Sequence, residues 1–229
     1  MIVPIVAEET WRKSLCEIPA WNPPVNSILL VAPHPDDETL AAGGFIAAQR
    51  LRGVDIVVAA VTDGENAYTN TPGLGTLRQQ EQQDALNRLG VRSDQILRFH
   101  LPDSNVSSRE AELVELLLPH ASNDTHILAP WIGDFHPDHI ACGLAAEEVE
   151  RRTGAFLTSY FFWTWHRGDA DVLAGLNLVR FDLTPALVTA KLEALQCHRS
   201  QLTHESGAPI LPDSLLDPAK RPFEVFLLP

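Results

Sequence analysis

The chain has 229 residues, of which 45% are hydrophobic and 21% charged, so it can bury a large core and is not an intrinsically disordered protein. Its formal net charge of -13 disfavours binding to nucleic acid or to an anionic membrane, because phosphate groups would meet a repelling surface. Three cysteines without a CxxC pair, and no secretory or transmembrane segment at the start, predict a reduced, cytoplasmic protein.

The first residues differ in pattern from the rest of the chain. Residues 1–26 contain prolines and tryptophans with little periodicity, so we expect an N-terminal arm packed on the domain. Residues 27–229 contain no internal repeat or low-complexity tract, and we expect a single domain there. The oligomeric state is left open, a homo-oligomer included.

The next segment joins a buried strand to a helix through a charged junction. The apolar run from Ile28 to Val31 predicts a buried strand, and the segment from Thr39 to Arg52 predicts a helix that stops at Gly53. Between them lies His34-Pro35-Asp36-Asp37-Glu38. One imidazole and three carboxylates at such a junction indicate a functional site more than a solvated turn.

The remaining elements alternate between strands and helices. Strands are expected at 56–61, 95–101, 126–130, 157–165, 177–182 and 223–228, and helices at 76–89, 108–120, 137–152 and 185–201. Such alternation predicts βαβ units with right-handed crossovers, and therefore an α/β fold with a mostly parallel sheet.

Polar residues follow several of these strands. Thr62-Asp63-Gly64-Glu65, Asp103 and the segment from Asp134 to His139 each come after a predicted strand. The last segment contains His136-Pro137-Asp138-His139, which repeats the His-Pro-Asp pattern of the first junction. Because ligands of parallel sheets bind beyond the carboxyl ends of the strands, we expect an active site at this edge.

The two His-Pro-Asp runs supply the residue types of a catalytic metal site. His34 and Asp37 are three residues apart at a helix start and can face one point, which His139 can approach from the second run. Two histidines and one carboxylate suit Zn²⁺ with an open position, and they also suit Fe²⁺ or another divalent metal. Asp36 is then a candidate general base, and His136 can stabilise an oxyanion or protonate a leaving group.

The alternative is that each run only begins a helix. Proline suits the first helical turn, and aspartate there complements the helix dipole. The presence of both runs, each after a buried strand, favours the metal site.

The two runs resemble the signature motifs of the PIG-L/LmbE-like de-N-acetylases, zinc hydrolases that remove acetyl groups from N-acetylglucosamine derivatives. The resemblance implies a Rossmann-like three-layer sandwich, with zinc bound by His34, Asp37 and His139. It also implies Asp36 as general base and His136 as the electrostatic or acid histidine. Further matches are Thr62-x-Gly64-Glu65, Arg78-x-x-Glu81 with Leu89-Gly90-Val91, Leu101-Pro102-Asp103, and Lys191 with His198-x-Ser200-Gln201.

Three more residues acquire expected roles from this resemblance, and a fourth from a departure from it. Arg78 and Asp103 match positions that contact substrate in the family, and Glu65 lies near them. Some relatives that act on sugar thiols carry a tyrosine two residues before the second motif's histidine, where this chain has Asp134. We expect Asp134 to orient His136 and to favour its cationic form.

The expected function is a zinc-dependent hydrolase that removes an acetyl group from a small N-acetylated amino sugar or glycoconjugate. One alternative is an amidase that releases another acyl group or cleaves a thiol conjugate. Another is a metal-binding module without turnover, which the presence of Asp36 and His136 disfavours. The aromatic run from Phe161 to His166 either lines the substrate pocket or packs in the core.

Overall fold

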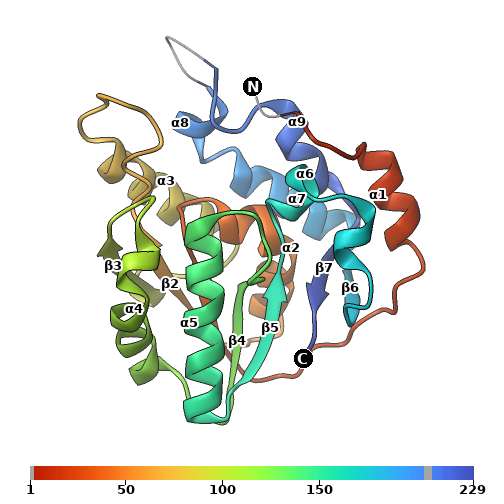
Figure 1. The fold of residues 1–229 in the computed structure, drawn as a ribbon, viewed down its shortest axis with the longest axis horizontal. Coiled ribbons are helices and arrows are strands. Elements are labelled where there is room, and N and C mark those ends of the chain that lie inside the picture. Colours follow the sequence, from red (N-terminus) through yellow and green to blue (C-terminus); the bar gives the residue numbers. More distant parts are fainter. Residues whose placement is uncertain (1–2, 204–207) are drawn as a thin grey trace.

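The computed structural model describes residues 3–203 and 208–229 (Figure 1). Its strands are β1 (Ser27–Ala32), β2 (Ile56–Thr62), β3 (Ile96–Leu101), β4 (Thr125–Pro130), β5 (Phe156–Tyr160), β6 (Leu178–Asp182) and β7 (Phe223–Leu227). They form one seven-stranded sheet in the order β3-β2-β1-β4-β5-β7-β6. Strand β7 runs antiparallel to β5 and β6, and the other pairs are parallel.

Helices cover both faces of the sheet (Figure 1). They are α1 (Glu8–Leu15), α2 (Asp37–Leu51), α3 (Leu74–Arg88), α4 (Glu110–Leu117), α5 (Pro137–Thr153), α6 (Thr164–Arg167), α7 (Pro185–Leu195), α8 (Arg199–Leu202) and α9 (Asp213–Leu216). Short 3₁₀ helices span Ser93–Gln95, Val106–Arg109, Leu118–His120, Ala170–Leu173 and Asp217–Lys220. The predicted α/β fold with a mostly parallel sheet between helical layers is confirmed.

Strand β1 lies in the middle of the sheet and is buried on both faces. Ile28, Leu30 and Ala32 pack in one core cluster with residues of α2, α3 and α7. Leu29 and Val31 pack in a second cluster with residues of α4 and α5. Successive strand residues point to opposite faces, so a strand covered on both sides needs the unbroken apolar run that the sequence shows.

The parallel strands end at one edge of the sheet, and the two His-Pro-Asp runs meet there. Strand β1 leads into His34, and its neighbour β4 leads toward His136. From β1 the chain continues to β2 on one side, whereas β4 lies on the other. This is the switch point of strand order, where α/β sheets leave a crevice for ligands.

Two predicted elements differ from the expectation, one ending earlier and the other divided in two. The predicted strand 157–165 stops at Tyr160, because the backbone amides of residues 162–164 donate to the Asp134 carboxylate and turn the chain into α6. The predicted helix 185–201 is divided into α7 and α8. Glu81 accepts the amide of Ser200 at 2.8 Å, which provides a partner for the start of α8.

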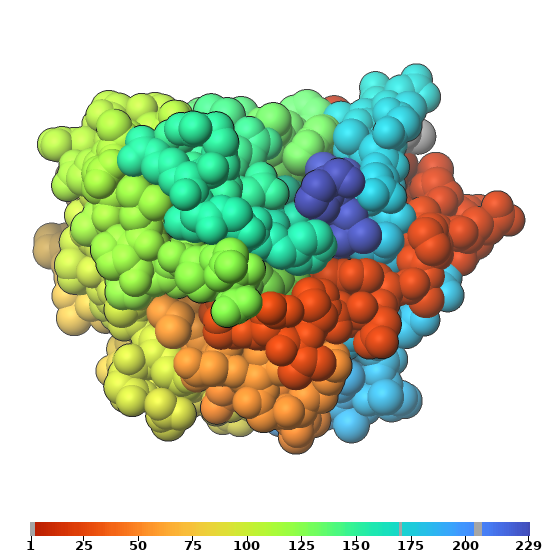
Figure 2. All heavy atoms as spheres, turned by 90° about the horizontal axis from the view of Figure 1, so that it is seen from below, coloured from red at the N-terminus to blue at the C-terminus, as the bar shows by residue number. Residues whose placement is uncertain are grey.

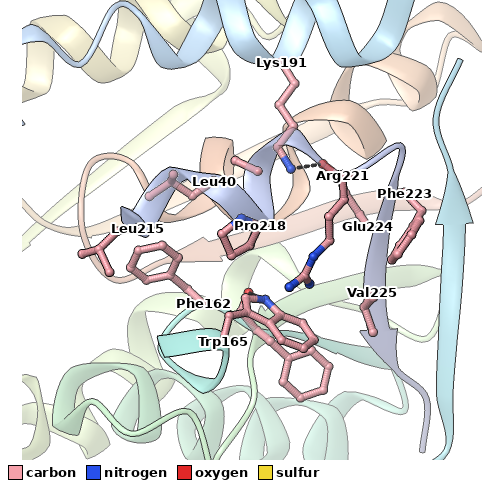
Figure 3. A pocket seen from close by; sticks show the side chains of 13 residues that line it. Leu40, Phe162, Trp165, Lys191, Leu215, Pro218, Arg221, Phe223, Glu224 and Val225 are labelled. Carbon is pink, nitrogen blue, oxygen red and sulfur yellow. Dashed lines mark hydrogen bonds and ion pairs between the residues drawn. The ribbon is translucent and has the colours of Figure 1, made fainter. Parts of the chain in front are cut away.

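Helix α2 is interrupted at Ala42, whose φ of -136° is not helical. Beyond the interruption, the amides of Gly44 and Phe45 donate to the Glu224 carboxylate at 2.8 and 2.7 Å. Lys191 Nζ lies 2.7 Å from the same carboxylate, and Figure 3 shows this buried pair. Glu224 of β7 therefore holds the second half of α2 and the cation of α7 together.

The N-terminal segment runs over the outside of the domain (Figure 2). Periodicity does not predict α1, which forms in this segment and is fixed by two contacts. Trp11 Nε1 donates to the carbonyl of Trp165 at 3.0 Å. Glu8 accepts two hydrogen bonds from Arg221, whose guanidinium lies over the Trp165 ring (Figure 3). Across residues 3–203 and 208–229, no helix has the length and apolar character needed to cross a bilayer.

Candidate active site

A pocket opens at the carboxyl edge of β1 and β4 and contains about 600 Å³ of space, part of it open to solvent. The lining residues are His34, Asp36, Asp37, Ala67, Arg78, Asp103, Ser104, His136, Phe162, Trp163, Ile210 and Leu211.

Two histidine nitrogens converge on one carboxylate oxygen beside this pocket. His34 Nδ1 lies 3.1 Å and His139 Nε2 lies 3.2 Å from Asp37 Oδ2. His139 is fully buried, and its Nε2 lies beside the Asp37 carboxylate without forming a regular hydrogen bond to any described residue. A buried ring nitrogen left in this way requires a partner, and a divalent cation among these three groups would be one. The donor set therefore fits a metal ion.

Among residues 3–203 and 208–229, two other groupings of metal-ligating side chains share His34. One ligand atom each of His34, His136 and His139 lie within 4.8 Å of one another, and the same holds for His34, Asp103 and Asp138. His34 is therefore common to all of these possible ligand sets.

Each of the two converging histidines has a carboxylate at its other nitrogen. Asp138 Oδ2 lies 3.1 Å from His34 Nε2, and Asp134 Oδ2 lies 2.8 Å from His139 Nδ1. Such partners fix the orientation of a metal-binding imidazole. The structure corrects our expectation that Asp134 orients His136, because Asp134 is buried against His139. Asp138 received no role from the sequence, although it lies inside the second motif.

Asp36 and Asp37 are neighbours with opposite electrostatic environments. Burial raises the pKa of Asp36 to about 6, and the charge of Asp37 adds to the effect. Burial would also raise the pKa of Asp37, but His139 and His34 overcome it and hold that pKa well below its usual range. A carboxylate with a pKa near 6 can exchange protons at neutral pH, whereas one paired with two histidines stays ionised.

The ring of His136 is held by its own helix and by an aromatic neighbour. Its Nδ1 accepts the amide of Asp138 at 3.2 Å, and its ring stacks on Trp163 with centroids 5.8 Å apart. Nε2 is thus the nitrogen left to act in the pocket. Burial lowers the pKa of His136 to about 4, and His34 and His139 add to the shift. This direction opposes the cationic form that we expected.

Arg78 is buried and points toward Asp36. Its Nη1 donates to the carbonyl of Gly64 at 2.7 Å, and its Nη2 donates to Gln201 Oε1 at 3.0 Å. Nη2 also lies 3.8 Å from Asp36 Oδ1. Arg78 therefore brings a fixed positive charge to one side of the pocket.

Asp103 lies at the pocket surface, and Glu65 lies behind Asp103 and contacts it. Asp103 lines the pocket, and its Oδ1 lies 3.4 Å from His34 Nε2 while its Oδ2 accepts the amide of Asn66 at 2.9 Å. Glu65 does not line the pocket. Its Oε1 accepts the amide of Asp103 at 3.0 Å, so Glu65 holds the loop that carries Asp103.

One wall of the pocket is apolar and comes from segments outside the signature motifs. Phe162 and Trp163 follow β5, and Ile210 and Leu211 belong to the segment after α8. Sequence reasoning left open whether the aromatic run lines a pocket or packs in the core. It does both, because Phe161 and Trp165 pack in a core cluster with α1.

Comparison with known proteins gives matches over most of the chain. The sequence model of the PIG-L family, described as GlcNAc-PI de-N-acetylase, matches residues 29–150. The chain is 30% identical over 195 residues to the probable N-acetyl-alpha-D-glucosaminyl L-malate deacetylase 2 of Bacillus cereus, covering 76% of this chain and 83% of that protein. It is 26% identical over 203 residues to the diacetylchitobiose deacetylase of Thermococcus kodakarensis, covering 79% and 72%.

A solved structure shares the fold. The N,N'-diacetylchitobiose deacetylase of Pyrococcus horikoshii superimposes with a TM-score of 0.65 at 24% identity, over 87% of this chain and 81% of that one. The matches confirm the predicted resemblance and the predicted deacetylase class. The chain belongs to the PIG-L family of de-N-acetylases.

Proposed function

We propose that the chain is a zinc-dependent hydrolase that removes the acetyl group from a small N-acetylated amino sugar or glycoconjugate. One observation carries the proposal: His34 Nδ1 and His139 Nε2 converge on Asp37 Oδ2 next to Asp36, inside an open pocket. The deacetylases of N-acetylglucosaminyl malate and of diacetylchitobiose among the relatives support the choice of substrate class.

His34, Asp37 and His139 would hold the ion. A bound divalent metal supplies a water of lowered pKa and polarises the carbonyl of the acetamide. We propose zinc because two histidines and one carboxylate leave a position open for water, although the same set binds Fe²⁺. Asp134 and Asp138 keep the two ligand histidines in place.

The side chains that remain perform the proton and charge steps. Asp36 accepts a proton from the attacking water at its carboxylate and returns it to the amine as the C–N bond breaks. Its pKa of about 6 leaves it ionised at neutral pH and ready for this transfer. His136 donates through Nε2 to the oxygen that becomes negative. Acetate and a free amine are the products.

We propose that Arg78 and Asp103 contact the sugar, because both line the pocket. Glu65 would act on the substrate through Asp103, whose amide it binds. We also propose a cytoplasmic enzyme with an N-terminal arm at residues 1–26 and one domain at 27–229. The three cysteines are free, as a reducing compartment requires.

The test is the release of amine and acetate from defined sugars. Zinc-loaded protein is incubated with N-acetylglucosamine, N,N'-diacetylchitobiose and N-acetylglucosaminyl malate, and both products are quantified. We expect equal amounts of amine and acetate from at least one sugar, and loss of both after chelation. Release of neither product from any of these sugars by zinc-loaded protein would contradict the proposal.

Two variants separate the neighbouring aspartates. We expect Asp36→Asn to keep zinc and to lose turnover by roughly 100- to 10,000-fold, as for a lost general base. Asp37→Asn should instead lose zinc. Asp84→Asn, at an exposed position on α3, is the control and should keep both. Zinc lost in Asp36→Asn and kept in Asp37→Asn would reverse the two assignments.

One observation favours a second candidate, an amidase that releases a longer acyl group. The apolar wall of Phe162, Trp163, Ile210 and Leu211 could bury a hydrocarbon chain. Comparing kcat/KM for N-acetyl and N-octanoyl glucosamine distinguishes the two. A preference for the octanoyl amide would replace the acetyl substrate in our proposal.

A further inference from the structure

Gln201 joins two parts of the site that flank Asp36. This side chain lies in α8 and is fully buried. Its Nε2 donates to the carbonyl of Pro35, the residue before Asp36, and its Oε1 accepts from Arg78 Nη2 at 3.0 Å. One amide group therefore holds both the backbone beside Asp36 and the guanidinium that faces the Asp36 carboxylate.

The guanidinium of Arg78 depends on this contact for its position. Arg78 Nη2 is 3.8 Å from Asp36 Oδ1, which is too far for a hydrogen bond. Its protein acceptors are the Gly64 carbonyl at one end and Gln201 at the other. Without Gln201, the Gly64 carbonyl would be the one hydrogen-bond acceptor left for the group among the described residues, and only charge attraction over 3.8 Å would direct Nη2 toward Asp36.

Gln201 is itself held firmly. Glu81 accepts the Ser200 amide at 2.8 Å and the Ser200 hydroxyl at 2.6 Å, which binds α8 to α3. The carbonyl of Gln201 accepts the amide of Leu211 at 2.9 Å, and Leu211 lines the pocket. A side chain supported in this way can fix the groups that it binds to within the tolerance that catalysis needs.

We propose that Gln201 is a positioning residue, which keeps the Asp36 carboxylate directed into the pocket by binding the Pro35 carbonyl and Arg78. The inference rests on the proposed role of Asp36 as general base. Gln201 acts on turnover through these two contacts and takes no part in binding metal or sugar.

The test replaces Gln201 with methionine, which has a similar volume but no hydrogen-bonding amide. With N,N'-diacetylchitobiose as substrate, we expect kcat to fall roughly 10- to 100-fold, because a misplaced catalytic group costs about this factor. We expect unchanged zinc stoichiometry, and a KM that rises less than kcat falls, because Arg78 keeps its bond to the Gly64 carbonyl. The melting temperature should drop by a few degrees, because a buried carbonyl and a buried guanidinium each lose a partner. Gln196→Met is the matched control, because Gln196 is exposed at the end of α7, and it should behave as wild type.

A double variant checks that the effect passes through Asp36. If Gln201 only positions Asp36, the Asp36→Asn/Gln201→Met protein has the same kcat as Asp36→Asn alone. Independent losses that multiply in the double variant, or a wild-type kcat in Gln201→Met, would overturn the inference. So would a loss of zinc in Gln201→Met in proportion to kcat, since that is the result of general disruption.

Two further results are possible: a wild-type kcat in Asp36→Asn, or a Gln201→Met protein that does not fold. Wild-type kcat in Asp36→Asn would refute the proposed general base, and it would be seen before Gln201 is altered. If Gln201→Met does not fold, the same measurements are made on Gln201→Asn. That variant keeps the amide but is one methylene too short to reach both partners, so the same drop in kcat is expected. A crystal structure of the variant should show the Asp36 carboxylate displaced.

Discussion

Removing the negative charge of Glu224 should strongly destabilise the fold, although this residue lies outside the pocket. Glu224 is 3% exposed, and its carboxylate accepts from Lys191 Nζ and from the amides of Gly44 and Phe45. Glu224→Gln keeps the shape of the side chain. Its amide has a single oxygen, so at least one of these buried donors loses its acceptor.

The expected loss of unfolding free energy has two sources, the ion pair with Lys191 and the hydrogen bonds from the two backbone amides. Leaving a buried lysine without its counter-charge typically costs about 3–5 kcal/mol. A buried amide without an acceptor costs a further 1–3 kcal/mol, roughly, of which local relaxation recovers part. We therefore expect Glu224→Gln to lower the free energy of unfolding by about 4 kcal/mol.

Urea unfolding followed by circular dichroism measures this loss. Lys191→Met removes the stranded charge, so the Lys191→Met/Glu224→Gln protein should be at least as stable as Glu224→Gln alone. Glu148→Gln is the control, because Glu148 pairs with Arg151 and Arg152 on the surface, and its unfolding free energy should be nearly that of wild type. A loss below about 1 kcal/mol in Glu224→Gln, or strict additivity in the double variant, would refute the reasoning.

Three further predictions concern pH, metal and backbone. Burial lowers the pKa of His126 to about 4, so the unfolded chain binds a proton that the folded chain does not, and stability falls as the pH falls from about 6.5 to 4. His126→Gln should therefore lose about 2 kcal/mol less unfolding free energy than wild type between pH 7 and 5, measured by urea titration. Asp134→Asn should weaken zinc binding roughly 10- to 100-fold in a chelator competition, because it removes the carboxylate partner of a proposed ligand histidine. Gly64→Ala would place a Cβ against Arg78 Nη1 and should lower kcat in a steady-state assay, whereas Gly53→Ala, with similar positive φ but no atom within 4 Å, should not.

Much of the architecture follows from short-range pattern. The unbroken apolar run from Ile28 to Val31 predicts a strand covered on both faces, and β1 is such a strand. Each strand-to-helix junction places its polar residues at the carboxyl edge, because parallel strands share one direction. The two His-Pro-Asp runs were therefore predictable at one edge of the sheet, whereas the pairing of β1 with β4 that makes them neighbours is seen only in the structure.

The sequence pattern does not determine which polar side chains contact one another. Those contacts depend on the direction in which each side chain points in the folded protein. Asp134 is closer in sequence to His136 than to His139, yet it binds His139 Nδ1, whereas His136 Nδ1 accepts the amide of Asp138. The same buried carboxylate draws the amides after β5 into α6, against the strand propensity of that aromatic run.

The contact between Gln201 and Arg78 joins residues 123 positions apart, and no periodicity in the chain relates them. Sequence alone therefore determined the fold class and the residue types gathered at the sheet edge. Only the tertiary structure decided their partners, because burial removes water as the alternative partner and each polar group must take what the packing places within about 3 Å.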